Sequence, residues 1–269
     1  MRRQENTLSS NWIKFIGTAG ARFVMIKQLR SSGGVWLHLN NANVILDPGP
    51  GSLVRCNKLR PPLDPTKLDA CILTHKHLDH CADINVMIEA MTEGGFKKRG
   101  IVFCPQDCLG EEGVIFKYLL NFPQEIKILH EGEMYQIRDL KFKCVGRNQH
   151  PVETYGLIFY VENLKIGFTS DTAFFSKLLD WYKGVDILVI NVVFFARRKE
   201  VQHLCLEDAE TLISKLKPKL SILTHFGMTM LKNNPHKICE QLRDKLNLQV
   251  ISAYDGYLLD LKDFMESNK

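Results

Sequence analysis

The sequence predicts an α+β protein in which two β-sheets pack face to face and helices cover the outside. Short apolar runs typical of strands alternate with helix-like segments, and this order occurs twice along the 269 residues. No tandem repeat with a period of roughly 20 to 50 residues interrupts it. Apolar residues make up 45% and charged residues 24% of the chain, which is typical of a globular protein with a buried core.

The first half of the chain supplies mainly strands. Strand-like runs cover residues 23–29, 35–39, 43–47, 69–74 and 101–104, most of them bounded by Gly, Asn or Pro. Residues 79–92 contain neither Gly nor Pro and predict a helix that begins at Asp79. Residues 127–146 predict a strand, a turn and a second strand.

The second half repeats the plan. Residues 154–171 predict a hairpin with its turn at Glu162 and Asn163, and residues 172–183 predict a helix. Further strands are expected at 186–191, 220–225 and 248–256, and amphipathic helices at 205–217 and 235–247. The stretches 60–67 and 196–204 are too short to separate domains, so we expect one domain over residues 1–269, with a flexible segment at 1–11.

Composition excludes several classes of protein. No apolar run approaches the roughly 20 residues that a membrane-spanning helix needs, and the basic N-terminus lacks the apolar stretch of a signal peptide. Cytoplasm is therefore the expected location. The eight cysteines form no C-x-x-C pair, which favours reduced thiols over disulfides or a structural zinc site. A net charge of +5 permits an anionic substrate but does not demonstrate one.

The stretch THKHLDH, residues 74–80, carries the strongest chemical signal. It holds three of the nine histidines and follows directly on a predicted strand. His75 and His77 face the same side of an extended chain, and Asp79 and His80 then open the predicted helix. Crowding these polar groups together is costly unless they share a cation, so the stretch predicts a metal site.

Three more ligand-type residues stand at the ends of apolar runs, namely His150, Asp171 and His225. Each would be unremarked alone, and Asp171 in Ser-Asp-Thr could instead cap the helix predicted at 172–183. Together they complete a set of five histidines and two aspartates, enough for two metal ions with a bridging carboxylate. Zinc suits these nitrogen and oxygen ligands, with manganese and iron as alternatives.

The H-x-H-x-D-H motif at His75–His80, with the other ligand-type residues in order, resembles the metallo-β-lactamase superfamily over nearly the whole chain. The resemblance implies a four-layer αββα sandwich of two mixed β-sheets with helices on the outer faces. It also implies the roles of the ligands. One metal would be held by His75, His77 and His150, the other by Asp79, His80 and His225, with Asp171 as the bridge and Asp47, in Asp-Pro-Gly, as a support that is not a ligand.

The resemblance is greatest to the ribonuclease Z and cyclic phosphodiesterase branch. True β-lactamases carry a different residue where Asp171 stands. His203, followed by Cys205 where Ser or Thr is usual, resembles the histidine that contacts the scissile phosphate in this branch. Residues 17–23 with Arg30 resemble its opening strand and loop. The stretch between His80 and His150 shows no Gly/Pro-rich arm for transfer RNA, so a small cyclic or linear phosphodiester is an equal candidate substrate.

The resemblance therefore implies a dinuclear metal-dependent hydrolase, a phosphodiesterase that directs a metal-bridging hydroxide at a nucleotide, a cyclic phosphate or RNA. Asp79 and His203 are its candidate catalytic residues. The alternative is a lactonase or thioesterase on the same metals, for which a phosphate-contacting histidine would be unnecessary. A non-catalytic binding protein is disfavoured because no ligand is missing. Phe226 and Gly227, after His225, either line the pocket or form a turn. The sequence leaves the oligomeric state undecided, with a homodimer as one alternative.

Overall fold

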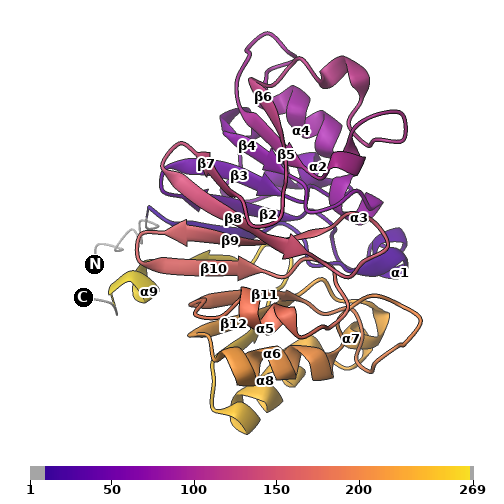
Figure 1. Ribbon diagram of the computed structural model, residues 1–269, viewed down its shortest axis with the longest axis vertical. Coiled ribbons are helices and arrows are strands. Elements are labelled where there is room, and N and C mark those ends of the chain that lie inside the picture. Colours follow the sequence, from indigo (N-terminus) through magenta and orange to yellow (C-terminus); the bar gives the residue numbers. More distant parts are fainter. Residues whose placement is uncertain (1–9, 267–269) are drawn as a thin grey trace.

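Two seven-stranded β-sheets make up the centre of the computed structural model, in which residues 10–266 are described. The sheets pack face to face. Helices α2 and α4 lie outside the first sheet, and α5, α6 and α8 lie outside the second (Figure 1). The predicted αββα sandwich of two mixed sheets is therefore confirmed. No helix within residues 10–266 is long and apolar enough to cross a membrane.

The first sheet has the strand order β14-β1-β2-β3-β4-β5-β6. The strands are β1 (Trp12–Phe15), β2 (Val35–Leu39), β3 (Ala42–Leu46), β4 (Ala70–Ile72), β5 (Ile101–Cys104), β6 (Glu125–Ile128) and β14 (Leu258–Asp260). Neighbours from β14 to β3 are antiparallel, whereas β3 to β6 are parallel. The C-terminal ends of β3 and β4 consequently meet at one edge.

The second sheet has the order β13-β12-β11-β10-β9-β8-β7 and the same mixture of directions. Its strands are β7 (Met134–Ile137), β8 (Leu140–Arg147), β9 (Tyr155–Val161), β10 (Leu164–Phe168), β11 (Ile187–Asn191), β12 (Leu220–Thr224) and β13 (Val250–Ser252). Strands β10 to β13 are parallel, and β7 to β10 are antiparallel. The ends of β8, β10, β11 and β12 therefore share one edge.

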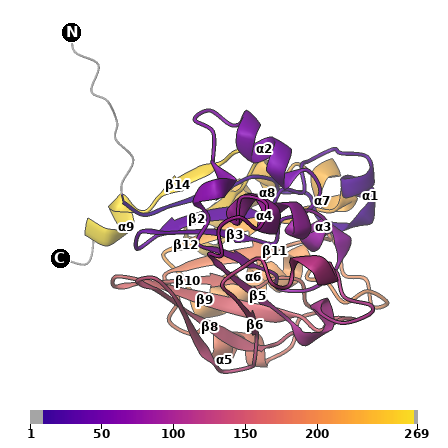
Figure 2. The ribbon, with the colours of Figure 1, turned by 90° about the horizontal axis from the view of Figure 1, so that it is seen from above.

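Most of the helices are short. They are α1 (Ala21–Ile26), α2 (Ser52–Lys58), α3 (Leu78–Cys81), α4 (Ile84–Met91), α5 (Lys177–Trp181), α6 (Leu206–Leu216), α7 (Met228–Lys232), α8 (Pro235–Leu246) and α9 (Lys262–Glu266). Single 3₁₀ turns occur at Pro65–Lys67, Gln106–Cys108 and Lys117–Leu119. Helix α1 lies beside α3 and α7 at one end of the molecule (Figure 2).

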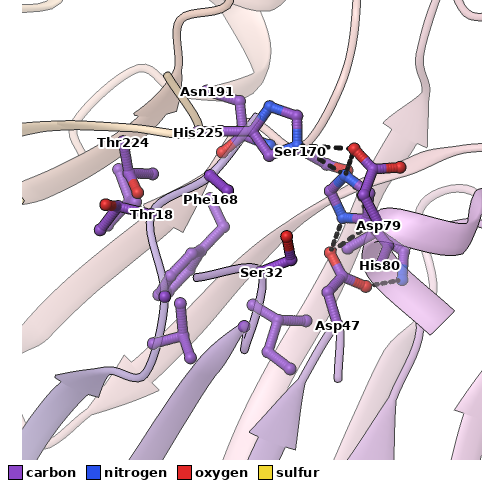
Figure 3. A pocket seen from close by; sticks show the side chains of 17 residues that line it. Thr18, Ser32, Asp47, Asp79, His80, Phe168, Ser170, Asn191, Thr224 and His225 are labelled. Atoms are coloured by element: carbon purple, nitrogen blue, oxygen red, sulfur yellow. Dashed lines mark hydrogen bonds and ion pairs between the residues drawn. The ribbon is translucent and has the colours of Figure 1, made fainter. Parts of the chain in front are cut away.

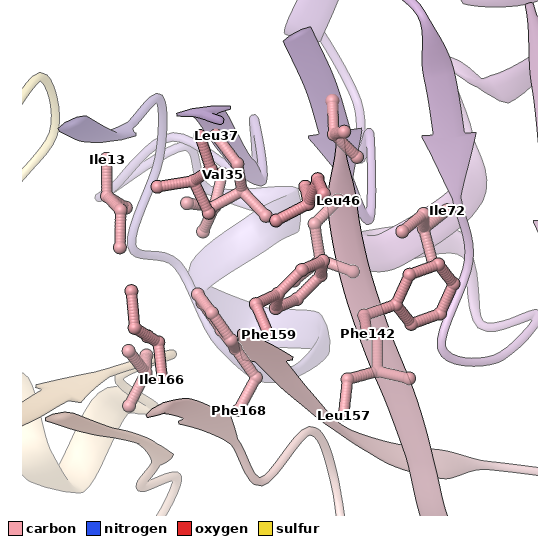
Figure 4. Close-up of a cluster of buried hydrophobic side chains, with 14 of the residues drawn as sticks. Ile13, Val35, Leu37, Leu46, Ile72, Phe142, Leu157, Phe159, Ile166 and Phe168 are labelled. Atoms are coloured by element: carbon pink, nitrogen blue, oxygen red, sulfur yellow. The ribbon is translucent and has the colours of Figure 1, made fainter. Parts of the chain in front are cut away.

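The largest hydrophobic cluster fills the space between the sheets. Figure 4 shows side chains of both sheets meeting there, with Phe142, Phe159 and Phe168 against Leu46 and Ile72. Each sheet also packs against its outer helices through one further hydrophobic cluster. All eight cysteines are buried and free, as their spacing predicted. These clusters hold the strand ends at fixed positions, which is what a site built on loops requires.

Residues 23–29 were predicted to form a strand, and this prediction is wrong. Residues 21–26 form helix α1, of which only Val24 is buried. The place beside β2 in the first sheet is taken instead by β1, which the sequence did not reveal and which also pairs with β14. An apolar run that finds no partner strand satisfies its backbone hydrogen bonds locally, as a helix does.

The helix predicted at 79–92 is divided into α3 and α4. At the break, the Asp83 carboxylate accepts hydrogen bonds from the backbone N–H groups of Gly51 (3.1 Å) and Leu53 (3.0 Å). The Asp83 carboxylate thus satisfies backbone N–H groups at the start of α2, although Asp83 itself stands at the start of α4.

Other predicted boundaries also change. Within 172–183 only α5 is helical. The stretch 127–146 holds the end of β6, which belongs to the first sheet, and the two strands β7 and β8, which pair in the second sheet. The predicted last strand, 248–256, is shortened to β13, and β14 follows it. The flexible segment expected at 1–11 lies outside the described residues except for Ser10 and Asn11. Of these two, Asn11 is buried.

Candidate metal centre

The ends of strands from both sheets bring together the residues that the sequence singled out. Asp47 follows β3, the 74–80 stretch follows β4, and His150, Asp171 and His225 follow β8, β10 and β12. Four groups of three among them have ligand atoms within 4.8 Å of one another, and these groups contain all nine residues predicted for the site: Asp47, His75, His77, Asp79, His80, His150, Asp171, His203 and His225.

One of these groups consists of His75, His77 and His150. The Nδ1 atom of His77 lies 3.0 Å from Nε2 of His150. The His75 ring is edge-on to both of the others, with ring centroids 4.9 and 5.1 Å away. The backbone carbonyl of Gln202 lies 3.1 Å from Nδ1 of His150 and orients its ring. Three imidazoles therefore converge with one nitrogen each directed at a common point.

A second group consists of Asp79, His80 and His225. The Nε2 atoms of His80 and His225 are 2.9 Å apart, and the Asp79 carboxylate lies 3.4 Å from Nε2 of His225. Figure 3 shows the three side chains meeting above Asp47. This triad and the previous one are the two ligand sets that the sequence resemblance implied.

Asp171 lies between the two triads and is 2% exposed. Its Oδ2 atom is 3.8 Å from Nε2 of His75 and 3.5 Å from Nε2 of His80, while Oδ1 is 3.4 Å from Nδ1 of His225. The amide of Asn191, at the end of β11, donates to Oδ1 at 2.8 Å and fixes the carboxylate. One carboxylate therefore reaches a histidine of each triad.

Asp47 and Thr74 form a hydrogen-bond network that determines which ring nitrogens carry protons. Asp47 accepts from the Thr74 N–H (2.7 Å), from the Thr74 hydroxyl (2.7 Å) and from Nδ1 of His80 (3.0 Å). The Ser170 hydroxyl donates to Thr74 Oγ1 at 2.7 Å. Because the only proton of Thr74 Oγ1 goes to Asp47, Nδ1 of His75, 3.1 Å away, must donate to it. In His75 this leaves Nε2 as the lone-pair nitrogen.

This arrangement fits a bound cation. Nε2 of His75 is buried, has no hydrogen-bond partner in the protein, and faces the anionic oxygen of Asp171 with a lone pair of its own. Nδ1 of His203 and Nδ1 of His225 are likewise buried without a hydrogen-bond partner. Unpaired buried polar atoms cost free energy, and a divalent ion among imidazole nitrogens and carboxylate oxygens removes that cost.

The electrostatics of the cluster agree with this interpretation. Burial lowers the pKa of His75, and the adjacent His80 lowers it further, so that this ring stays neutral as a metal ligand must. Burial raises the pKa of the Asp171 carboxyl, but His225, His80 and His203 outweigh burial and hold that pKa well below its usual value. The carboxylate between the triads is therefore ionised.

His80 behaves differently. Burial lowers its pKa, but Asp171, Asp79 and Asp47 raise it more, to well above the usual value. A proton on Nε2 of His80 and a metal ion at that atom are alternatives, because either one neutralises the same carboxylates and metal binding displaces the proton.

His203 lies next to both triads but belongs to neither. Its Nδ1 atom is 3.5 Å from Oδ2 of Asp171, and its ring centroid is 5.1 Å from that of His150. The segment before α6 is held where Asp208 accepts hydrogen bonds from the N–H and thiol of Cys205 (3.0 and 3.1 Å) and pairs with Arg197. Cys205 thus fills, as N-cap of α6, the position where Ser or Thr was expected.

The N-terminal loop packs directly on His225. A Cβ atom at Gly20 would lie 2.0 Å from the His225 carbonyl oxygen, so only glycine fits there. Asp255, after β13, holds this loop by accepting hydrogen bonds from Thr18 N (2.9 Å), Thr18 Oγ1 (2.8 Å) and Ser31 N (2.8 Å). Between this loop and the triad of His80 lies a small cavity, of about 50 Å³, which is shown in Figure 3.

Sequence reasoning missed the residues that orient the cluster. Thr74 was quoted only as part of THKHLDH, while Ser170, Asn191 and Asp255 were given no role. Thr74, Ser170 and Asn191 occur next to a predicted ligand or at the end of a predicted strand, which is the one signal that could have found them.

A model of the family described as "Beta-lactamase superfamily domain" matches residues 42–226, more than half of the chain. The chain belongs to the metallo-β-lactamase superfamily. The superfamily match extends from β3 to just beyond β12 and so includes every residue of the two triads, Asp171, His203 and Asp47. A relative matches over nearly its whole length: the uncharacterized protein MJ1374 of Methanocaldococcus jannaschii is 33% identical over 257 residues, covering 93% of this chain and 94% of the relative.

Solved structures of similar fold agree with the superfamily. The metallo-β-lactamase fold protein YhfI from Bacillus subtilis has a TM-score of 0.74 at 18% identity, covering 93% of this chain and 99% of YhfI. A diphosphatase from the PhnP family has a TM-score of 0.68 at 18% identity and 94% and 98% coverage. The short form of human tRNase Z has a TM-score of 0.64 at 16% identity and 92% and 98% coverage. At these identities the likeness establishes the fold.

Proposed function

We propose that this protein is a hydrolase that uses two divalent metal ions and cleaves phosphodiesters. His75, His77 and His150 would hold one ion, and Asp79, His80 and His225 the other, with Asp171 bridging them. The imidazole and carboxylate donors suit zinc, with manganese or iron as alternatives. When bound, such a pair of ions supplies Lewis acidity and an activated water at neutral pH.

The residues of the chain contribute binding, orientation and proton handling. Asp79, partly exposed beside His80 and His225, can accept a hydrogen bond from the attacking water and so orient it. Burial lowers the pKa of His203, although the adjacent Asp171 raises it, so the ring is mainly neutral near pH 7. A neutral imidazole still carries one N–H, which can donate to a phosphoryl oxygen or to the leaving oxygen.

The position of His203 is the observation that carries the choice of phosphodiesters. It stands 3.5 Å from the candidate bridging carboxylate and outside the two triads assigned to the metal ions, so we assign it to the substrate, although it forms a further group of ligand-type residues with His150 and Asp171. A carbonyl ester develops a single oxyanion, which a metal ion alone can stabilise. A phosphodiester shares its charge over two non-bridging oxygens, so a donor besides the metal ions has a function there, whereas protonation of the leaving oxygen is needed in both classes of ester. Two neighbours in fold, a diphosphatase and tRNase Z, also act on phosphorus by name.

A substrate panel tests the proposal. The zinc- or manganese-loaded protein would be assayed with bis(p-nitrophenyl) phosphate, a cyclic nucleotide, precursor transfer RNA and a set of lactones. We expect hydrolysis of at least one phosphodiester and none of the lactones. Turnover of lactones without any phosphodiester would overturn the proposal in favour of the carbonyl ester hydrolase.

We predict two metal ions per chain under metal-replete conditions. The reason is that the structure offers two triads with one carboxylate between them, and each triad leaves buried lone pairs without a partner when no cation is present. Inductively coupled plasma mass spectrometry on the desalted protein measures the ratio. A saturating ratio of one or zero contradicts a dinuclear centre.

We predict that Asp47→Asn weakens metal binding by about 10- to 100-fold, the usual effect of losing a group that orients a ligand. Asn tolerates the backbone of Asp47, which has a φ of 52°, so the fold should persist. An amide offers one neutral oxygen in place of two anionic ones, so the two oxygens that accept from Thr74 and His80 cannot both be replaced and Nδ1 of His80 loses its anionic partner. Competition with a chelator measures the affinity, and Asp244→Asn on the surface of α8 is the control. Unchanged affinity in Asp47→Asn would remove Asp47 from the site.

A further inference from the structure

A second cavity adjoins the candidate metal centre between α1, the loop after β11 and the start of α7. It has a volume of about 180 Å³ and is lined mainly by apolar side chains and backbone. By the same measure a single water needs roughly 10 to 15 Å³, so this cavity is large enough for part of a ligand. Helices α1 and α7 lie at the same end of the molecule in both views (Figures 1 and 2).

The walls of this cavity touch the candidate site itself. Gly20 and Gly227 line it and connect it to the residues that follow His225: the N–H of Gly20 donates to the carbonyl of Phe226 at 3.0 Å, and Gly227 is the next residue. The ring of Phe194, also in the lining, stands edge-on to His203 with ring centroids 6.0 Å apart. Phe226 is fully buried in the adjacent core, so only Gly227 of the expected pair lines a pocket.

The chemistry of the cavity is aromatic with one cation. Phe23 of α1 lines it and is 67% exposed, so its ring is open to a ligand. The guanidinium of Arg198 lies 4.8 Å from the centre of the Phe194 ring. Within residues 10–266 Arg198 makes no ion pair, whereas its neighbour Arg197 is paired with Glu207 and Asp208. Arg198 therefore remains available to a ligand.

We propose that this cavity binds the nucleobase of a nucleotide phosphodiester whose phosphate lies at the metal centre. Aromatic rings and guanidinium planes are the groups on which proteins stack bases, and they act without reading a base sequence. Phe23, Phe194 and Arg198 supply such a platform beside His203. The inference rests on the proposed function and narrows its substrate class from any phosphodiester to esters of nucleosides.

Two esters with the same leaving group test this inference. Thymidine 5′-(p-nitrophenyl phosphate) and methyl p-nitrophenyl phosphate both release p-nitrophenolate, and they differ only in whether a nucleoside is attached. We expect the metal-loaded protein to have the higher kcat/KM for the thymidine ester. In Arg198→Ala and Phe23→Ala, kcat/KM for the thymidine ester should fall about 5- to 100-fold, the range of base stacking, and for the methyl ester it should be unchanged.

Two control substitutions are matched to these variants, one by its position in the sequence and one by its residue type and exposure. Lys199→Ala removes the cation next to Arg198, and Phe96→Ala removes a phenylalanine that is 94% exposed and lies outside the cavity. Neither should alter the ratio of the two esters. Equal losses with both esters in Arg198→Ala and Phe23→Ala, or no loss with either, would overturn the nucleobase site while leaving the phosphodiesterase intact. If the wild-type protein cleaves neither ester and no phosphodiester of the substrate panel, the proposed function is refuted, and the nucleobase site with it.

Discussion

Asp171→Ala is expected to lose at least one metal ion and nearly all hydrolytic activity. Asp171 lies within 3.8 Å of histidines of both triads, so its removal would leave two cations facing each other without this shared anion. Thermal stability in the metal-loaded state should fall as well, because metal binding to the folded chain contributes to the free energy of folding. Metal analysis, activity and a thermal melt on the same preparation measure the three effects.

The variant Asp171→Asn distinguishes the loss of a metal-bridging carboxylate from a loss of local structure. The side-chain oxygen of asparagine can still accept the hydrogen bond from Asn191, which preserves the local fold. Its amide nitrogen then faces His75 and His80 and cannot bridge two cations. We expect this variant to fold and to lose metal, whereas Asp180→Asn on the surface of α5 should behave as wild type. Two metals and full turnover in Asp171→Asn would mean that the bridge is assigned to the wrong residue.

The rival sequence interpretation of Asp171, as the cap of a helix over residues 172–183, is wrong. Helix α5 begins at Lys177 with Ser176 as its N-cap residue, and Asp171 lies well before it. A stability loss of about 1 kcal/mol, as a lost cap produces, is therefore not the expected result for Asp171→Ala.

His203→Ala is expected to keep both metal ions and to lower phosphodiester turnover by about 10² to 10⁴, the usual contribution of a positioned acid or base. His150 should keep its orientation in the variant, because its Nδ1 contacts the backbone carbonyl of Gln202 and not a side chain. kcat and metal content on the same sample measure the outcome, and His236→Ala, at a residue whose side chain is 74% exposed, is the control.

The structure also defines what would contradict this role. His203, His150 and Asp171 form a group that could itself hold a metal ion. Loss of one metal in His203→Ala would make His203 a ligand. Full metal content with unchanged turnover of phosphodiesters would instead make it a bystander.

The sequence located the candidate site because its signal is local. Each ligand-type residue directly follows an apolar run, and parallel strands bring such ends to one edge of a sheet. The supporting hydrogen bonds could not be found in this way. Asp255 and Thr18 are 237 residues apart, and Ser170 and Thr74 are 96 residues apart. Thr74 and Ser170 stand next to predicted ligands, but nothing near either partner in the sequence identifies the distant residue that it contacts.

The errors in the fold have the same origin. The run at 23–29 suits a strand by composition, but β1 occupies the place beside β2, and only pairing across the whole chain decides which segment is included. The break at Asp83 depends on its contact with α2, about 30 residues earlier in the chain. In both cases a distant partner overrides a local preference.

The pairing of β14 with β1 dictates the order in which the molecule can be completed during synthesis. Trp12 pairs with Asp260, so the edge of the first sheet is closed by a segment that lies after all of the ligand-type residues in the chain. Asp255, a few residues earlier, is also needed to hold the loop that packs on His225. A nascent chain that already contains all of the ligand-type residues therefore still lacks Asp255 and β14, which hold the surrounding loop and sheet edge. Pairing between segments so far apart in the chain forms slowly. The loop that packs on His225 and the edge of the first sheet therefore require Asp255 and β14, both of which follow the last ligand-type residue, His225, in the chain.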